Sequence, residues 1–213
     1  MSEGLEGVVA AETVLSEVDG AAGRLIVRGR SLDELAGHTR YEEVVRLLFD
    51  GFYEDLPQDI QAALGRARVE VFAEVAALDT GLLDRTTIEA MRALTARLAD
   101  GDDAAVAFRL LAAPAVFTAA VVRAQAGEAP VAPDPSLRHA ADILRMLRGA
   151  PASPAEADAL DTYLVTVADH GLNASTFAAR VVASTRAGLT SAVLAGISAL
   201  KGPLHGGAPG PVI

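Results

Sequence analysis

Two histidines flanked by glycine are the residues of this sequence whose type and setting could do chemistry. His170 precedes Gly171 in the segment ADHGLNAS, and His205 precedes Gly206 in the segment GPLHGGA. Imidazole can donate a hydrogen bond to an oxygen atom in either protonation state, and backbone next to glycine can approach a ligand closely. Both histidines are therefore candidates for binding an anion or a carbonyl oxygen. The structural alternative for each is a histidine that only caps a helix end.

The other two histidines, His38 and His139, are predicted to be solvated or packed side chains without a role in chemistry. His38 follows a glycine between helices, and His139 lies in the first turn of a helix. No HExxH pattern occurs, and the four histidines are far apart in the sequence, so the sequence predicts no metal site. The absence of cysteine excludes disulfides and thiolate metal ligands.

Helix signals on both sides of His170 suggest how it is positioned. Ser153, Pro154 and Glu156 form a capping box with proline at the first helical position, so a helix is expected to begin there. We expect this helix to end at His170, with Gly171 as its left-handed cap, which places the imidazole at the negative end of the helix macrodipole.

Two further helices are predicted between His170 and His205. Asn173 or Ser175 caps the first, TFAARVVAST, and Thr190 or Ser191 begins the second, SAVLAGISALK. Gly202 and Pro203 stop the second helix just before His205.

The rest of the chain is predicted to be a helical scaffold. Residues 12–29 are the exception, because two short apolar runs flank the turn sequence DGAAG and predict a two-stranded hairpin. From residue 31 to residue 202 the pattern is helical. Helix starts are marked by three capping boxes, which pair Ser31 with Glu34, Thr39 with Glu42, and Thr86 with Glu89. A long helical stretch is expected from Pro57 to Leu78, broken near Gly65.

Residues 103–125 are predicted to form a nearly uniformly apolar helix with Pro114 as a kink. Such a helix lies in a core or a subunit interface, and it favours an oligomer. Its most apolar run, Leu110 to Val122, is thirteen residues long, which we take as too short to span a bilayer.

Composition supports an all-α fold and limits the partners. The chain is 51% hydrophobic with only 4% aromatic residues, and most of its apolar residues are Ala, Leu and Val. The net charge of −10 disfavours binding to nucleic acid or to an anionic membrane, so an anionic substrate would need a local cluster of cations. The first residues, MSEGLEGVV, lack a signal-peptide core, and a cytoplasmic protein, or an organelle-matrix protein, is expected.

The segment from Ala168 to Ala208 resembles the two histidine motifs of the citrate synthase family, separated by that family's usual two helices. The similarity extends over the whole chain. GLEGVVAAETVLSEVDGAAGRLIVRGRSLDELAG resembles the amino-terminal segment of the family, YEEVVRLLFDG the helix that follows, and HAADILRMLRG the helix before the histidine pair.

The resemblance implies a multi-helical fold with a large and a small domain, working as a homodimer that condenses acetyl-CoA with oxaloacetate. Residues 1–213 would be the amino-terminal portion of the large domain, with residues 203–213 leading toward the hinge. By motif, His205 would stabilise the enol of the acetyl group and His170 would help to bind oxaloacetate. Asn173 and Ser175 would shape the adjoining turn. No cofactor is expected, because the acyl-CoA is a substrate.

The sequence also departs from the family pattern. Gly171 replaces the glutamate that commonly follows the first histidine, and Pro209 replaces the asparagine that commonly follows GGA. The resemblance places the base aspartate, a third histidine and the substrate-binding arginines beyond Ile213, so the isolated chain is expected to be inactive. Two alternatives stay open: a 2-methylcitrate synthase that uses propionyl-CoA, and a non-catalytic helical paralogue or scaffold.

Overall fold

The computed structural model describes residues 11–206, which fold into helices and one small sheet. The three strands are β1 (Ser16–Asp19), β2 (Arg24–Val27) and β3 (Arg30–Ser31). The helices are α1 (Leu32–Leu35), α2 (Tyr41–Phe49), α3 (Ile60–Phe72), the 3-10 helix η1 (Ala73–Ala77), α4 (Thr80–Leu83), α5 (Thr87–Thr95), α6 (Ala104–Gln125), α7 (His139–Arg148), α8 (Pro154–Thr166), α9 (Ala174–Ser184) and α10 (Leu189–Leu200). The predicted all-α fold with a small amino-terminal sheet is confirmed.

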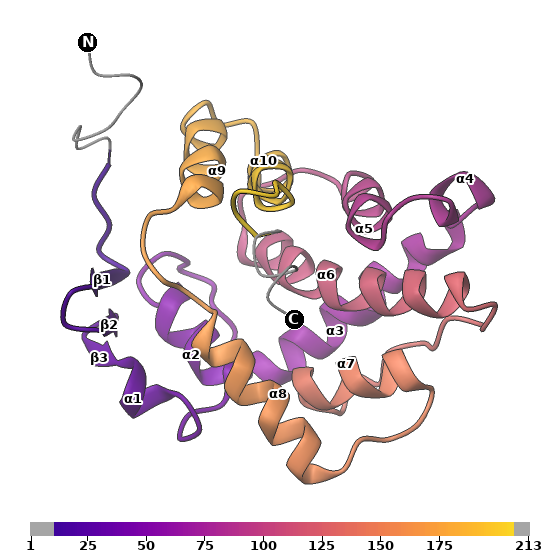
Figure 1. Ribbon diagram of the computed structural model, residues 1–213, viewed down its shortest axis with the longest axis horizontal. Helices are drawn as coiled ribbons and strands as arrows, with labels where there is room; N and C mark the ends of the chain where they lie inside the picture. Colours follow the sequence, from indigo (N-terminus) through magenta and orange to yellow (C-terminus); the bar gives the residue numbers. More distant parts are fainter. Residues whose placement is uncertain (1–10, 207–213) are drawn as a thin grey trace.

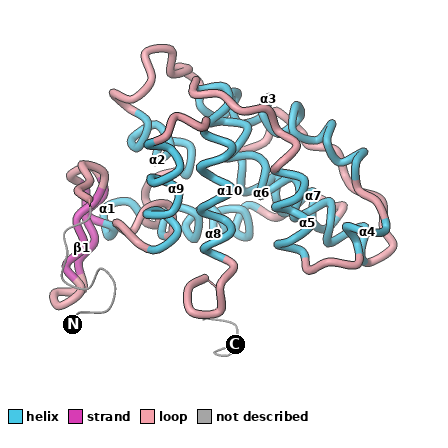
Figure 2. The backbone as a smooth tube through the Cα atoms, turned by 90° about the horizontal axis from the view of Figure 1, so that it is seen from above, coloured by secondary structure: helices cyan, strands magenta, loops and turns pink. Residues whose placement is uncertain are grey.

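Helix α6 is the central element around which the others pack. It contacts α3, α5, α7 and α10, and α9 packs against α10 on the outside. Figure 1 shows α6 crossing the middle of the molecule, with α7 and α8 on one side and α5 and α10 on the other. The sheet lies at one end, apart from the main helical layer, as Figure 2 shows from above.

The apolar character of α6 is explained by burial within this chain. Twelve of its 22 residues are buried, among them Phe108, Val116 and Phe117. Within residues 11–206, α6 is the one helix long and apolar enough to cross a membrane, but 61% of its most apolar window is buried inside the protein. The prediction that this segment is too short to span a bilayer is therefore wrong as regards length, because the helix runs through Pro114 for 22 residues. Its apolar surface gives no separate support for an oligomer.

The amino-terminal sheet has three strands rather than the predicted two. β1 pairs with β2 in antiparallel register, with Val18 opposite Leu25, which confirms the hairpin. β3 adds to the other edge of β2, where Ile26 lies opposite Ser31. The chain turns back at Arg28 and Gly29, both with positive φ, so Ser31 ends the sheet and also caps α1.

Three of the predicted helix starts are confirmed because their capping contacts are local. Each of the three capping boxes pairs the residue before the helix with the glutamate three positions later. The three starting residues are Ser31, Thr86 and Ser153. Glu156, for example, accepts the Ser153 backbone N–H at 2.9 Å.

The start of α2 was predicted one residue too early. The backbone N–H of Arg40 donates to Glu43 Oε2 at 2.8 Å, so the pair Thr39 and Glu42 does not form the box. Glu42 instead is buried, and its Oε1 accepts the backbone N–H of His139 at 2.7 Å. A partner nearly one hundred residues away thus takes the carboxylate that the local pattern assigned to the cap.

Helix α3 begins at Ile60, after the cap Asp59, and runs unbroken through Gly65. The expected stretch from Pro57 to Leu78 is therefore shorter, with the 3-10 helix η1 at its end. Gly65 serves packing: a Cβ atom there would lie 2.2 Å from the carbonyl oxygen of Pro135. The small residue lets the loop before α7 lie directly on α3.

Replacing Gly65 by alanine is expected to lower the free energy of unfolding by about 1–3 kcal/mol, because backbone atoms must move to admit the methyl group. Urea denaturation measures this loss. Gly20→Ala is the control, since a Cβ atom at Gly20 meets nothing within 4 Å and should change stability by less than about 0.5 kcal/mol. Equal effects of the two substitutions would contradict the packing role of Gly65.

A buried polar cluster joins α3 to α7 and contains His139. Arg68 Nε donates to Asp142 Oδ2 at 2.7 Å, and Arg68 Nη1 lies 3.2 Å from His139 Nδ1. The His139 ring stacks on Tyr41 with centroids 5.4 Å apart. The prediction that His139 is packed is confirmed. The start of α7 was placed two residues too early, at Ser136, which instead bonds to Asp134.

The fold is expected to lose stability in mild acid because of His139. Burial, reinforced by the charge of Arg68, lowers the pKa of His139 from 6.5 to about 3. The unfolded chain then binds the proton more readily, so the stabilisation is full above about pH 6.5 and declines as the pH falls toward about 3. The slope is expected to reach up to ~1.4 kcal/mol per pH unit.

Urea denaturation between about pH 7.5 and pH 5 measures this slope, since ordinary carboxylates titrate at lower pH. The variant His139→Gln should show a flatter dependence than the parent chain. His38→Gln is the matched control, because His38 is exposed and does not belong to the buried cluster of Arg68, His139 and Asp142. A parent-like slope in His139→Gln would exclude His139 as the cause.

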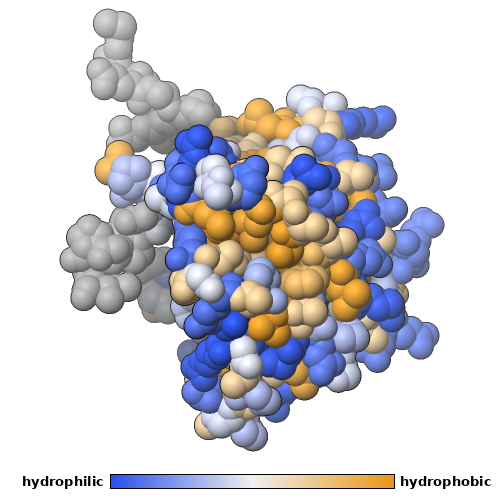
Figure 3. Space-filling view, turned by 90° about the vertical axis from the view of Figure 1, so that its right-hand side faces the viewer, coloured by the Kyte–Doolittle hydropathy of each residue, from blue (hydrophilic) through white to orange (hydrophobic). Residues whose placement is uncertain are grey.

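The surface combines charged and apolar regions. Figure 3 shows one face on which hydrophobic residues gather in the centre and hydrophilic residues surround them. An apolar area of this kind marks a surface suited to contact with another polypeptide.

Candidate functional site

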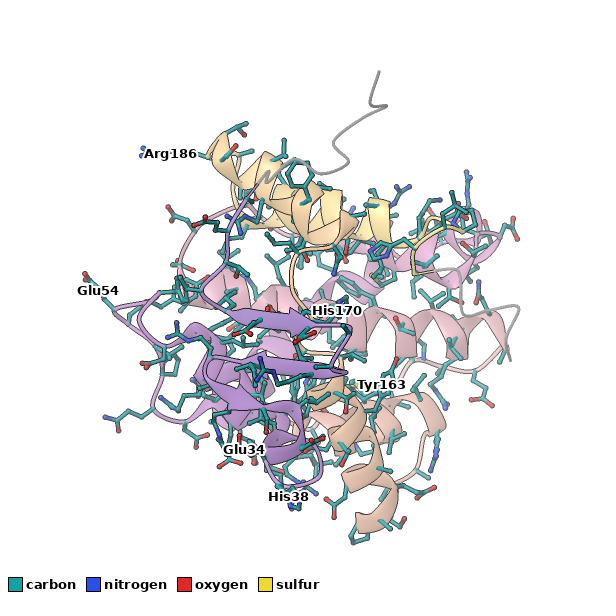
Figure 4. All side chains as sticks on the ribbon, turned by 60° about the vertical axis from the view of Figure 1, so that its left-hand side comes forward. Glu34, His38, Glu54, Tyr163, His170 and Arg186 are labelled. Carbon is teal, nitrogen blue, oxygen red and sulfur yellow. The ribbon has the colours of Figure 1, made fainter. Side chains whose placement is uncertain are left out.

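His170 lies in the loop between α8 and α9, and not in the last turn of a helix. Helix α8 ends at Thr166, four residues earlier than expected. The predicted placement of His170 in the last helical turn is therefore wrong, and its imidazole does not lie at the negative end of the α8 macrodipole. The side chain is exposed, and Figure 4 shows it in the middle of the molecule, far from His38 at the lower edge.

Gly171 has a structural reason to be glycine. Its φ is +84°, and a Cβ atom there would lie 2.9 Å from Val18 Cγ2 in β1. Its backbone N–H donates to Asp169 Oδ1 at 2.9 Å. The loop that carries His170 is thus folded tightly against the amino-terminal sheet, and a side chain such as glutamate does not fit in this conformation.

Asn173 is the cap of α9, which settles the choice left open between Asn173 and Ser175. Its Oδ1 accepts the backbone N–H of Thr176 at 3.0 Å. Ser175 Oγ donates to the same oxygen at 2.7 Å, and Asn173 Nδ2 lies 3.4 Å from His170 Nδ1. One asparagine side chain therefore connects the helix end, Ser175 and His170.

Helix α10 begins at Leu189, after Gly188, and so neither Thr190 nor Ser191 is its cap. Asp100, from the connection between α5 and α6, takes that role. Its Oδ1 accepts the Ser191 backbone N–H at 3.0 Å, and its Oδ2 accepts the Ser191 hydroxyl at 2.7 Å. The far end of α10 leads into the turn that holds His205, which is half-buried.

The pairing of α9 with α10 brings the two histidine motifs together. The helices have 11 and 12 residues, both about 17 Å long, and a short turn joins them. Because the two helices pack against each other, the end of α10 lies beside the start of α9. His205 Nε2 consequently lies 3.0 Å from Ser175 Oγ, thirty residues earlier in the sequence.

Hydrogen bonds link the four predicted site residues in the order His170, Asn173, Ser175, His205. The Ser175 hydroxyl has one proton and two neighbours that can accept it, Asn173 Oδ1 and His205 Nε2. When it donates to Asn173, Nε2 of a neutral His205 carries the ring proton. When it donates to His205, the ring proton lies on Nδ1, and that nitrogen becomes a donor for a ligand. The direction in which the Ser175 hydroxyl donates is therefore coupled to the tautomer of His205.

Ser175→Ala is expected to slow a reaction that uses His205 as a donor by about tenfold, the effect of losing one hydrogen bond of roughly 1–1.5 kcal/mol. Turnover of the native protein measures the rate, and ¹⁵N NMR of the His205 ring reports the tautomer. The control is Ser184→Ala, because Ser184 lies on the same helix and bonds only to Val181 O in the described structure. An unchanged tautomer in Ser175→Ala would contradict the role of Ser175.

All four residues line one cavity of about 830 Å³. Its walls are formed by the end of α8 and the loop that follows, the start of α9, the end of α10 with the turn after it, and one residue of α5. The lining residues are Ile88, Tyr163, Val167, Ala168, Asp169, His170, Gly171, Asn173, Ser175, Thr176, Leu200, Lys201, His205 and Gly206.

The polar groups of the cavity suit an oxygen-rich ligand. Two imidazoles and one ammonium, that of Lys201, face it, and Asp169 is the only carboxylate among its described lining residues. Asp169 is engaged by the Gly171 backbone N–H. Between residues 11 and 206 no group of three or more histidine, cysteine or acidic side chains could hold a metal ion.

The structure thus brings together every site residue that the sequence predicted. Lys201 was missed, although it directly follows α10 and lies only four residues before His205. The nearly equal lengths of the two helices between the motifs could have indicated that the motifs meet. Pro209 and the rest of residues 207–213 lie outside the described residues.

Comparisons with known proteins point to one family. The sequence model described as "Citrate synthase, C-terminal domain" matches residues 4–213. The citrate synthase of Haloferax volcanii is 41% identical over 98% of this chain. The 2-methylcitrate synthase of Mycobacterium tuberculosis is 37% identical, also over 98% of this chain.

A solved structure has the same fold. The citrate synthase of Thermoplasma acidophilum, in a ternary complex with carboxymethyl coenzyme A and oxaloacetate, superposes with a TM-score of 0.80 at 28% identity over 95% of this chain. This chain spans 59% of the Haloferax protein and 56% of both the Mycobacterium and Thermoplasma proteins.

Proposed function

Because the chain belongs to the citrate synthase family, we propose that its histidine cavity takes part in the condensation of an acyl-CoA with oxaloacetate. The observation that carries the proposal is the single hydrogen-bonded set formed by His170, Asn173, Ser175 and His205. The ternary complex of the Thermoplasma relative supports oxaloacetate and a coenzyme A derivative as the ligands.

His205 is proposed to stabilise the enol or enolate of the acyl group. Removing a proton from the carbon next to a thioester builds negative charge on the thioester oxygen, and a preorganised donor at that oxygen lowers the barrier. When the Ser175 hydroxyl turns from Asn173 Oδ1 and donates to Nε2, a neutral His205 presents an N–H at Nδ1 for this purpose. The enol carbon then attacks the ketone of oxaloacetate, and hydrolysis of the thioester releases CoA.

His170 is proposed to bind oxaloacetate. Asn173 Nδ2 lies 3.4 Å from Nδ1, and in a neutral ring this leaves the proton on Nε2. That nitrogen can donate to a carboxylate or ketone oxygen in the cavity. The exposed position of His170 leaves it accessible to a substrate.

The general base is proposed to lie outside these 213 residues, as the family resemblance implies. Asp169 is the only carboxylate among the described lining residues, and the Gly171 N–H already occupies one of its oxygens. The 213-residue chain by itself is therefore proposed to release no CoA.

Propionyl-CoA is the second candidate acyl donor, which would make the product 2-methylcitrate. The 37% identity to a 2-methylcitrate synthase supports it, since this value is close to the 41% identity to a citrate synthase. The relative rates with the two donors decide between them.

A homodimer is also proposed. Helix α9 buries none of its residues within the described structure, and Val181 on it is 51% exposed. A helix with apolar side chains and no buried residue is suited to a subunit contact.

The experiment that tests the function measures CoA release with oxaloacetate and either acetyl-CoA or propionyl-CoA. It is run on the native protein from its source, alongside its native mass, and on the 213-residue chain of 21.9 kDa. CoA release by the native protein, and none by the chain, is the expected result. No release by either with both donors would favour a non-catalytic scaffold.

A further inference from the structure

Lys201 is the one lysine in the sequence; the other seventeen of the 18 basic residues are arginine. It follows α10 directly, and it is the only lysine or arginine among the described residues that line the histidine cavity. In a chain with a net charge of −10, a cation at this place is a feature that an anionic ligand would need.

Glu89 holds the ammonium group in place. Lys201 Nζ donates to Glu89 Oε1 at 3.0 Å, while the other oxygen, Oε2, accepts the Thr86 hydroxyl at 2.8 Å. The Thr86 hydroxyl and Lys201 together lower the pKa of Glu89 to about 2, so that the carboxylate stays ionised. An ammonium has three N–H donors, and Glu89 takes one. The Lys201 side chain is one-third exposed.

A salt bridge that served only to connect α5 with the end of α10 would not require lysine. All the other ion pairs found in residues 11–206 use arginine. Arg92 Nη1 already joins the same two helices by donating to Ser198 Oγ at 3.2 Å. Lysine differs from arginine in presenting a compact, strongly hydrated point charge whose free donors can turn toward a ligand.

We propose that Lys201 is a substrate-binding residue whose ammonium group binds an anionic oxygen of the ligand in the cavity of His170 and His205. The proposal rests on the function proposed above. The anionic oxygen has two possible sources, a carboxylate of oxaloacetate and a phosphate of the coenzyme A moiety, and the test separates them.

The single lysine makes a direct measurement possible. A chain labelled with ¹³C-lysine gives one ε-CH₂ signal, which is followed by NMR together with the ring signals of the histidines. Oxaloacetate and coenzyme A are added separately up to about 10 mM at constant ionic strength. The expected result is a saturable shift of the lysine signal with one of the two probes, which names the source, accompanied by shifts at His170 and His205.

Binding to variants provides the second measurement. Lys201→Met is expected to weaken binding of that probe about tenfold or more, and Lys201→Arg less. Arg92→Met is the matched control. The substitution removes the hydrogen bond between Arg92 on α5 and Ser198 on α10, and Arg92 does not line the cavity. The dissociation constant of the probe for this variant should equal that for the parent chain.

The outcomes separate the two proposals. Shifts at the histidines with a stationary lysine signal, or parent-like binding by Lys201→Met, would overturn the role of Lys201 and leave the proposed function standing. No shift at any of the three residues with either probe would overturn the role of Lys201, and CoA release by the native protein decides the proposed function separately. The lysine titration uses the unmodified sequence, so it shows whether Lys201 binds either probe even if a variant fails to fold.

Discussion

Replacement of His205 by alanine is expected to slow CoA release by at least ~100-fold, since a single preorganised donor to a developing oxyanion is worth about 3 kcal/mol. His205 is half-buried, and Ser175 fixes its ring 3.0 Å away, so the donor is positioned before substrate arrives. Turnover of the native protein with saturating acyl-CoA and oxaloacetate is the quantity to compare.

His38→Ala is the control for this prediction. His38 is an exposed loop histidine, and it does not line the cavity. The control variant should retain parent turnover, and circular dichroism should show that both variants are folded. Near-parent turnover in His205→Ala would remove His205 from the mechanism.

Replacement of Asp142 by leucine is expected to cost about 3–5 kcal/mol of unfolding free energy, because it leaves the charge of Arg68 buried and uncompensated. Both side chains of the pair are 0% exposed. Arg68 Nη2 also donates to the carbonyls of Asp134 and Leu137, so the pair anchors the loop before α7. The expected loss is a large part of the stability of a typical domain, and urea denaturation measures it.

Two further variants test this interpretation. The double variant Arg68→Met with Asp142→Leu should recover much of the loss, because the fully buried Arg68 charge is removed together with its partner, while Arg145, the other partner of Asp142, is 19% exposed and keeps its bond to the Ala132 carbonyl. Arg24→Met removes the exposed pair with Glu17 and should cost less than about 1 kcal/mol. A loss in Asp142→Leu no larger than that in Arg24→Met would show that the buried pair does not stabilise the fold.

The sequence by itself determined the features that depend on neighbouring residues. The capping boxes at Ser31, Thr86 and Ser153 were found because donor and acceptor lie three residues apart. Where a distant residue also bonds to the box, as Lys201 does to Glu89, it takes the carboxylate oxygen that the box does not use. The histidine motifs were found for the same reason, since the glycines and the capping residue Asn173 stand beside them in the chain.

Tertiary structure decided the features that depend on a distant partner. Glu42 does not form the predicted capping box, because its carboxylate accepts the backbone N–H of His139. Asp100 caps α10 from about ninety residues away in the sequence. The end of α8 at Thr166 was likewise missed, because the loop that follows packs Gly171 against Val18 of the sheet.

The cavity is also a feature that depends on residues distant from one another in the sequence. The sequence named His170 and His205 separately, but it did not show that the α9–α10 pair brings them together through Asn173 and Ser175, nor that Lys201 joins them. The local sequence contains the residue types and the caps. Which of them meet depends on how α9 and α10 pack against each other and against α5 and α6, and that contact between helices is fixed only when the whole chain has folded.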